Sequence, residues 1–424
     1  MPDFDSTLAE AQQLIADELH RYALDAIAAL LEDETARLTT AQRQVLLQLA
    51  HQIWVALDDG TTKVYGALTE ALAKAAAAPD DPRAIFDAAY QLIERQAPHL
   101  AGGLLVRAWS ANPSELKLLH ELVAALELQG RYADARDRLR VPAEQADAAF
   151  LTRYLYAFNS IVVDDYDTAR AILRTLAPGG DTSREFMVAR LEDALRRADL
   201  VGSAASSRAR QFVFSGSLLL DAAPDIVTAR EEQWATYAEH LVRLREVLRA
   251  IDRAPSRAVS LRTSRKEMMA RAAAAIFEIP FAESWYPDGE GLYPTEHLAA
   301  MQPDVAAAFA QHQPGQIYYA HFAPTERELP FAADAIGTRG TDGVIAPWDL
   351  WCRLDYTRPD RPAGAPTETQ AEMAALIAAA APPPESLADL PPLLDLARRA
   401  HAAGLLELGQ DRGQRERLWA WPRS

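Results

Sequence analysis

A 34-residue spacing runs through the first half of the chain. Ala101, Ala135 and Ala169 are separated by 34 residues each, and Leu105, Leu139 and Leu173 follow the same step. Tyr132 and Tyr166, and Pro79 and Pro113, repeat it, while Ala67 extends the alanine series upstream. From Thr7 to about Leu200 the apolar residues recur at intervals of three and four residues, which is typical of helices. The first half is therefore predicted to be an array of repeated helical hairpins.

The best repeat has the sequence "LKLLHELVAALELQGRYADARDRL", residues 116 to 139. With its 34-residue period it resembles the tetratricopeptide repeat family. The resemblance implies that Ala135 lets the second helix approach the first and that Tyr132 fills the turn. It makes Leu119, Leu122, Leu126 and Leu139 the packed positions. It extends well over residues 80 to 175 and only as generic hairpins over 40 to 80 and 175 to 200. Val123 and Asp164 depart from the pattern, because the family prefers a very small residue and a turn glycine there.

The resemblance also implies a groove lined by the first helix of each repeat, which holds extended or helical peptides. Its positions here are Arg83, Phe86, Tyr90, Lys117, His120, Ala124, Leu151, Tyr154 and Phe158. The lysines and asparagines that clamp a terminal carboxylate in some members are missing. An apolar or aromatic partner segment is expected. Since Leu151, Tyr154 and Phe158 share one helical face, the protein's own C-terminal region is the other expected occupant.

The stretch "IVVDDYDTAR", residues 161 to 170, has two readings. Paired aspartates after an apolar run resemble the ribose-phosphate loop of phosphoribosyltransferases, but they also suit the turn of a helical hairpin. No glycine follows them, and Tyr166 and Ala169 continue the 34-residue series. The turn between two repeat helices is therefore the interpretation we adopt.

After residue 200 the pattern changes to short strands between helices. The expected strands are 212–220, 257–263, 316–322 and 343–347, and the expected helices are 226–251, 264–279 and 325–336. Ser264 with Glu267, and Thr325 with Glu328, have capping-box spacing. The fold class is thus α+α/β: a helical repeat domain (1–200), a small three-layer α/β domain with a mostly parallel sheet (205–355), and a proline-rich linker with C-terminal helices (356–424).

Ligands of such sheets lie beyond the carboxyl ends of the strands. There, Arg262, Thr263, Ser264, Arg265 and Lys266 gather hydroxyls and cations at an expected helix N-terminus, which suits a phosphate or carboxylate. The same residues also suit a plain cap and a solvated basic turn. His321 and Asp349 are candidates for acid–base chemistry, although His321 also fits a packed strand end. No catalytic residue, metal or cofactor is assigned.

Composition limits the function classes. The formal net charge of −17 disfavours nucleic acid as a partner. The single cysteine, Cys352, excludes an intrachain disulfide, and the N-terminus lacks the features of a signal peptide. No apolar run has the length of a membrane span. We expect a cytoplasmic location.

These observations favour a non-catalytic interaction scaffold or adaptor that uses the helical groove. The alternative is an enzyme or sensor for a phosphate ligand, a nucleotide or sugar phosphate, bound by the α/β domain.

Overall fold

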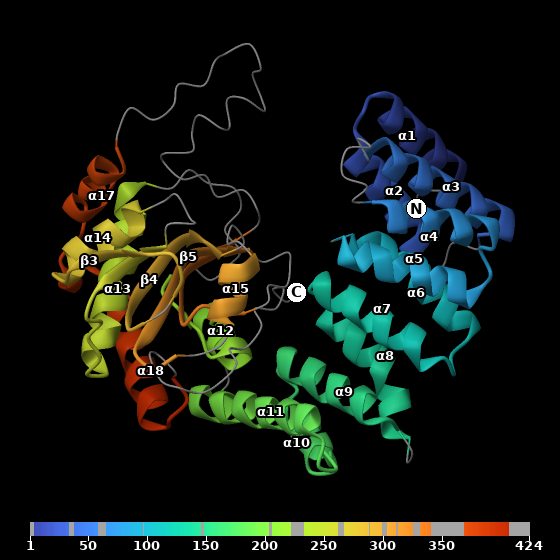
Figure 1. Ribbon diagram of the computed structural model, residues 1–424. Coiled ribbons are helices and arrows are strands. Elements are labelled where there is room, and N and C mark those ends of the chain that lie inside the picture. The colour runs from blue at the N-terminus through green and yellow to red at the C-terminus, as the bar shows by residue number, and fades with distance from the viewer. Residues whose placement is uncertain are drawn as a thin grey trace. The chain divides into compact units, whose positions relative to one another are not determined.

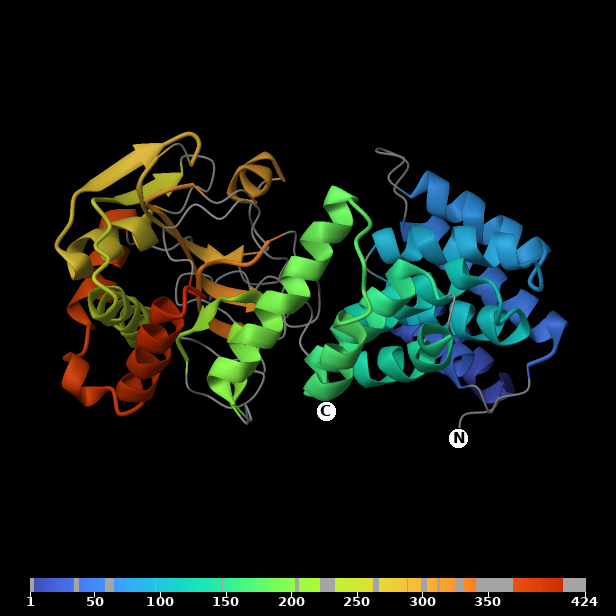
Figure 2. The same ribbon diagram turned by 90° about the horizontal axis from the view of Figure 1, so that it is seen from below.

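The computed structural model describes residues 4–33, 38–57, 65–95, 97–145, 148–202, 206–221, 233–261, 267–287, 289–298, 303–310, 313–324, 331–340 and 369–406. The chain forms two compact units, with the boundary between Gly179 and Gly180 (Figures 1 and 2). No helix in these ranges combines the length and the apolar character needed to cross a membrane.

The first unit is all helical. Its helices are α1 (Phe4–Ala16), α2 (His20–Glu32), α3 (Thr40–Leu57), α4 (Gly66–Ala77), α5 (Pro82–Glu94), α6 (Pro98–Ala111), α7 (Leu116–Leu128), α8 (Tyr132–Glu144), α9 (Phe150–Val162) and α10 (Tyr166–Leu173). From α3 to α10 each helix packs against the next one in sequence, and α5 also packs against α7 (Figure 1). This order of contacts is that of stacked helical hairpins.

The 34-residue series marks equivalent places in these hairpins. Ala101, Ala135 and Ala169 are each the fourth residue of their helix, α6, α8 and α10, and all three are fully buried. The turns before α8 and α10 also correspond, since Gly130 and Asp164 both have left-handed backbones, with φ of 72° and 62°. Asp165 caps α10 by accepting a hydrogen bond from the Thr168 N–H at 3.3 Å. The paired aspartates therefore lie in a turn between two helices, as the sequence predicts.

One contact in the helical unit joins elements far apart in sequence. Helix α2 packs against α6, and two glycines of α6 permit it. A Cβ at Gly103 would lie 2.7 Å from the Leu31 Cβ, which is too close for any side chain. Arg107 then reaches past these glycines and donates to the carbonyl oxygens of Leu31 at 2.8 Å and Asp33 at 2.6 Å. Because the last carbonyls of a helix have no partner within it, this guanidinium completes the end of α2.

The second unit is an α/β fold. Its elements are α11 (Thr182–Val201), α12 (Ser207–Ser215), β1 (Leu218–Leu219), α13 (Trp234–Ala250), β2 (Ala258–Leu261), α14 (Met268–Phe277), β3 (Phe281–Ser284), β4 (Gly291–His297), α15 (Pro303–Phe309), β5 (Gln316–Pro324), β6 (Ala335–Gly340), α17 (Gln370–Ala379), the 3-10 helix η3 (Pro384–Ser386) and α18 (Leu390–Ala402). Among the described strands the order is β1-β6-β5-β4-β2-β3, and every pairing is parallel.

The sheet separates two apolar cores. Helices α13 and α14 supply one core together with Tyr319 and Ala335 of the strands. Phe309 of α15 belongs to the other, with Tyr293 and Tyr318. Helices α17 and α18 add to the first core by packing on α14 and α13 (Figure 1). The expected three-layer α/β arrangement with a parallel sheet is therefore present.

Several expected boundaries differ from the structure. The strands expected at 257–263 and 316–322 are present as β2 and β5. Residues 212–215, expected in a strand, belong to α12, and only Leu218–Leu219 forms β1. The prediction of a helix at 325–336 is wrong at its C-terminal end, because β6 begins at Ala335. The strand expected at 343–347 and both capping-box residues Ser264 and Thr325 lie outside the described residues.

The tail belongs to the second unit. Helix α18 packs against α13 and α11, and α17 packs against α14 and α13. These two helices are therefore part of the fold of the second unit. Helix α11, which we assigned to the helical domain, also falls in the second unit.

Candidate functional site

The expected groove positions form three rows across the first helices α5, α7 and α9. The row Arg83, Lys117 and Leu151 is exposed in all three helices. The row Phe86, His120 and Tyr154 is half-buried in α5 and α7 and buried in α9. The row Tyr90, Ala124 and Phe158 runs from exposed to half-buried to buried. The accessible surface is thus widest on α5 and narrows toward α9.

Polar contacts fix the alignment of α7 and α9. The His120 Nε2 lies 3.0 Å from the Thr152 Oγ1, and the Asn159 amide donates to the Glu127 carboxylate at 2.7 Å. Burial lowers the pKa of His120, so its ring is neutral near neutral pH. Lys117 lies one helical turn before His120, and Leu151 directly precedes Thr152. The contact between His120 and Thr152 therefore sets Lys117 and Leu151, two residues of the exposed row, at corresponding levels of α7 and α9.

Two of the expected groove residues are not accessible. Tyr154 and Phe158 are 5% and 6% exposed, and their rings stack with centroids 6.4 Å apart. Phe158 also meets Tyr132 edge-on at 6.4 Å. The aromatic end expected on α9 is therefore core, whereas Tyr90 on α5 remains 43% exposed.

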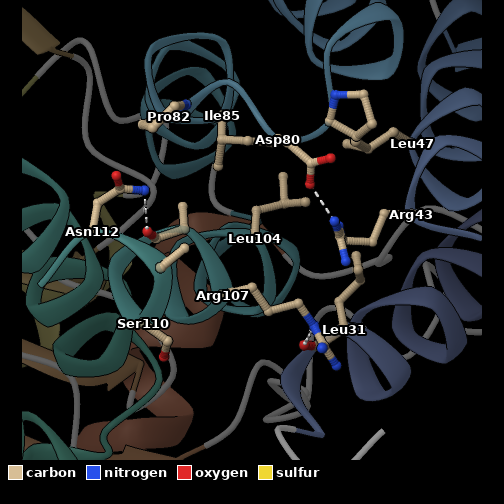
Figure 3. Close-up of a pocket in the computed structure, with 13 residues that line it drawn as sticks. Leu31, Arg43, Leu47, Asp80, Pro82, Ile85, Leu104, Arg107, Ser110 and Asn112 are labelled. Carbon is tan, nitrogen blue, oxygen red and sulfur yellow. Dashed lines mark hydrogen bonds and ion pairs between the residues drawn. The ribbon is translucent and has the colours of Figure 1, made fainter. Parts of the chain in front are cut away.

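A pocket of about 540 Å³ lies beside α6 (Figure 3). Leu31, Leu47, Ile85 and Leu104 form its apolar part, and Arg107 lies at one side of it. The complete lining is Leu31, Arg43, Leu47, Pro79, Asp80, Pro82, Ile85, Leu104, Arg107, Ala108, Ser110, Ala111 and Asn112. Its volume lies in the range of small-molecule sites.

The charged groups of this pocket have partners within the protein. Arg43 pairs with Asp80 (Figure 3). Asp80 also accepts a hydrogen bond from the Thr40 hydroxyl at 2.7 Å. These hydrogen bonds from Thr40 and Arg43 lower the pKa of Asp80. Arg107 is occupied by the carbonyl oxygens at the end of α2. A ligand here would rely on the apolar lining, since the arginines already serve the fold.

The predicted anion site cannot be compared with the fold. Arg262, Thr263, Ser264, Arg265 and Lys266 lie outside the described residues, and so does Asp349. Leu261 is the last residue of β2, and the anion-site segment follows it in the sequence.

The other catalytic candidate, His321, is fully buried on β5 and faces α13. Its Nδ1 lies 3.3 Å from the Nδ1 of His240 on α13 and 3.1 Å from the Oη of Tyr319. The ring of Tyr237 stacks on it, with centroids 3.6 Å apart and an interplanar angle of 10°. His321 is therefore the centre of a buried group of two histidines and two tyrosines.

Sequence reasoning identified only one member of this group. His240 falls three residues after Tyr237 and one before Leu241, on the apolar face of α13, and nothing there distinguishes it from a packed histidine. Its partner is 81 residues away. Only the packing of α13 on β5 brings the two rings together.

Gly337 of β6 adjoins this group. A Cβ there would lie 2.7 Å from the His240 Nδ1, 3.0 Å from the Tyr319 Oη and 2.4 Å from the His321 carbonyl oxygen. Within the described ranges, no three side chains of His, Cys, Asp or Glu are close enough to hold a metal ion. Tyrosine supplies the third polar atom here.

Comparisons with protein-family models, curated proteins and solved structures find no match to this chain.

Proposed function

We propose that the protein is an interaction scaffold or adaptor whose first-helix surface, on α5, α7 and α9, binds another polypeptide. The observation that carries the proposal is the exposed row Arg83, Lys117 and Leu151, which recurs every 34 residues on successive first helices. The tetratricopeptide resemblance supports the same surface, because the groove of that family lies on the first helices. This role requires no catalysis.

The chemistry of the surface suits a partner with an apolar or aromatic segment. Tyr90 and Leu151 are 43% and 41% exposed, so both side chains are accessible to a partner. Arg83 and Lys117 add positive charge to the same surface. Arg83 already forms an ion pair with Asp87 at 3.1 Å, so Lys117 is the stronger attraction for an acidic group.

Selection of a random peptide library on the full-length protein tests the proposal. We expect selected peptides to share an apolar or aromatic position, and Tyr90→Ala and Leu151→Ala each to weaken their binding about tenfold. Val141→Ala on α8 is the matched control, because Val141 is 64% exposed but lies on a second helix. No enrichment, or equal weakening by all three substitutions, would contradict the proposal.

A second function is proposed for the α/β unit, namely binding of a phosphate ligand at the carboxyl edge of its sheet. What favours it is the set of hydroxyl and basic residues at 262–266, which follow the parallel strand β2 in the sequence. Thermal-shift measurements with nucleotides and sugar phosphates test it. Arg262→Ala and Lys266→Ala should abolish any stabilisation, and an unchanged response would rule this function out.

A further inference from the structure

Three potential metal ligands converge in the core of the second unit. They are the Nδ1 atoms of His240 and His321 and the Oη of Tyr319, all from side chains that are at most 1% exposed. A neutral imidazole Nδ1 carries either one hydrogen or one lone pair, directed along a single axis. The Nδ1 of His321 nevertheless lies close to two polar atoms at once. A cation between the three atoms would engage each of them.

The separations fit coordination well. Two imidazole nitrogens, each about 2.0–2.1 Å from a tetrahedral ion, stand about 3.3 Å apart. The Nδ1 atoms of His240 and His321 are 3.3 Å apart, and the Tyr319 Oη is 3.1 Å from the His321 Nδ1. Both distances lie within or just beyond the usual range of hydrogen bonds, about 2.7–3.2 Å. What favours two ligands of one ion is that the single Nδ1 of His321 has two such neighbours.

The surroundings hold these atoms in place. Tyr237 stacks flat on His321 and fixes the plane of its ring. Gly337 has no side chain. A Cβ at this residue would lie 2.7 Å from the His240 Nδ1 and 3.0 Å from the Tyr319 Oη, so the glycine leaves that position empty. Ligands on rigid elements, here α13 and β5, give a more precise site than ligands on loops.

We propose that His240, His321 and Tyr319 bind a divalent first-row transition metal of the zinc class. Imidazole nitrogens suit Zn²⁺, Co²⁺ and Cu²⁺. On binding, a bond forms between the Tyr319 oxygen and the metal, the phenol O–H breaks, and the proton passes to solvent, so that the phenolate offsets one of the two positive charges. Three protein ligands leave a fourth position for water or a ligand, as in catalytic zinc sites. The site is independent of both functions proposed above.

Metal titration of the full-length protein tests the site. Chelator-treated protein in buffer free of phosphate is titrated with Zn²⁺ and with Co²⁺, whose visible spectrum reports tetrahedral coordination. We expect one equivalent to bind, together with the ultraviolet difference spectrum of an ionised tyrosine. His240→Ala and His321→Ala should weaken binding at least about 100-fold, and Tyr319→Phe should abolish the tyrosine signal.

His297→Ala is the matched control, because His297 lies at the end of β4 with its ring against Phe322, 4.7 Å away, outside the group. It should bind metal as the wild type does. If the histidine variants do not fold, X-ray absorption of the zinc-loaded wild type counts the imidazole ligands directly. The proposal is overturned if the wild type takes up no metal, if its bound zinc has no histidine ligand, or if folded His321→Ala binds as tightly as the wild type.

Discussion

Asp389 Oδ2 lies 2.8 Å from Arg208 Nη2, and this ion pair joins the residue before α18 to α12. The other carboxylate oxygen of Asp389 lies 3.0 Å from Arg243 on α13. Arg208 also donates to the carbonyl oxygens of Leu219 and Leu220 at the end of β1. One carboxylate therefore connects the tail to two helices and, through Arg208, to the sheet.

We expect Asp389→Asn to destabilise the second unit by about 2 kcal/mol. The two arginines are 11% and 9% exposed. Removing the charge of Asp389 takes this counterion from Arg208 and leaves Arg243 to its ion pair with Glu239, in a mostly buried place. Urea denaturation of the full-length protein, followed by hydrogen exchange of peptides from α12 and α18, measures the loss.

Asp395→Asn is the control for this experiment. Asp395 pairs with Arg399 on the surface of α18, where the two side chains are 66% and 48% exposed. Such pairs contribute about 0–1 kcal/mol. Equal effects of the two substitutions would show that the Asp389 cluster is not a structural connection.

Acidification should weaken the same cluster. Burial alone would raise the pKa of Asp389, but the hydrogen bonds and charges of Arg208 and Arg243 outweigh it and lower that pKa. A carboxyl with a lower pKa in the folded state stabilises the fold above its unfolded pKa, and the stabilisation is lost as the pH falls through the folded pKa. Below about pH 4 the wild type should therefore lose its stability advantage over Asp389→Asn. Parallel unfolding curves at each pH measure the difference, and a constant difference down to pH 2 would refute this explanation.

Gly103→Ala should destabilise the helical unit by about 2–3 kcal/mol, because the new Cβ would lie 2.7 Å from the Leu31 Cβ and force α2 away from α6. Gly66→Ala is the matched control at the first residue of α4, where a Cβ meets nothing within 4 Å. It should be neutral or slightly stabilising. Thermal unfolding of both variants compares them, and similar melting temperatures would contradict the close packing of α2 on α6.

Glu121→Gln should stabilise the helical unit at neutral pH. Burial and the charge of Glu94 raise the pKa of Glu121, so the ionised side chain costs free energy in the folded state. A group with a raised pKa contributes its stabilisation below the unfolded pKa and loses it as the pH rises through the folded pKa. Solvent screening at this half-buried site limits the gain to about 0.5 kcal/mol. Chemical denaturation at pH 7 and pH 4 checks it, because the gain should vanish at the lower pH.

The sequence predicted most accurately the features that depend on the spacing of residues within a helical hairpin. The places of Ala101, Ala135 and Ala169 follow from the spacing alone, since each packs within its own hairpin. Residues 212–215 and Ala335 were misassigned because buried elements lack polar alternation. A short apolar run in the core fits a helix or a parallel strand equally well.

The buried site could be predicted only in part. His321 was a candidate because it follows aromatic residues in an expected strand. Its neighbours come from α13 and β6, and their positions depend on which elements pack together, which no spacing in the sequence encodes. The burial of Tyr154 and Phe158 has the same origin, since a helical apolar face looks alike whether it is core or surface.

Site-specific photo-crosslinking in the source cells tests the central claim most directly. A photoreactive amino acid is placed at Tyr90, Lys117 or Leu151 on the first helices and, as a control, at Val141 on α8. The account predicts that the three first-helix positions form adducts with the same partner protein and that position 141 does not. Equal adducts at position 141, or none at the other three, would contradict the claim that this surface binds a partner.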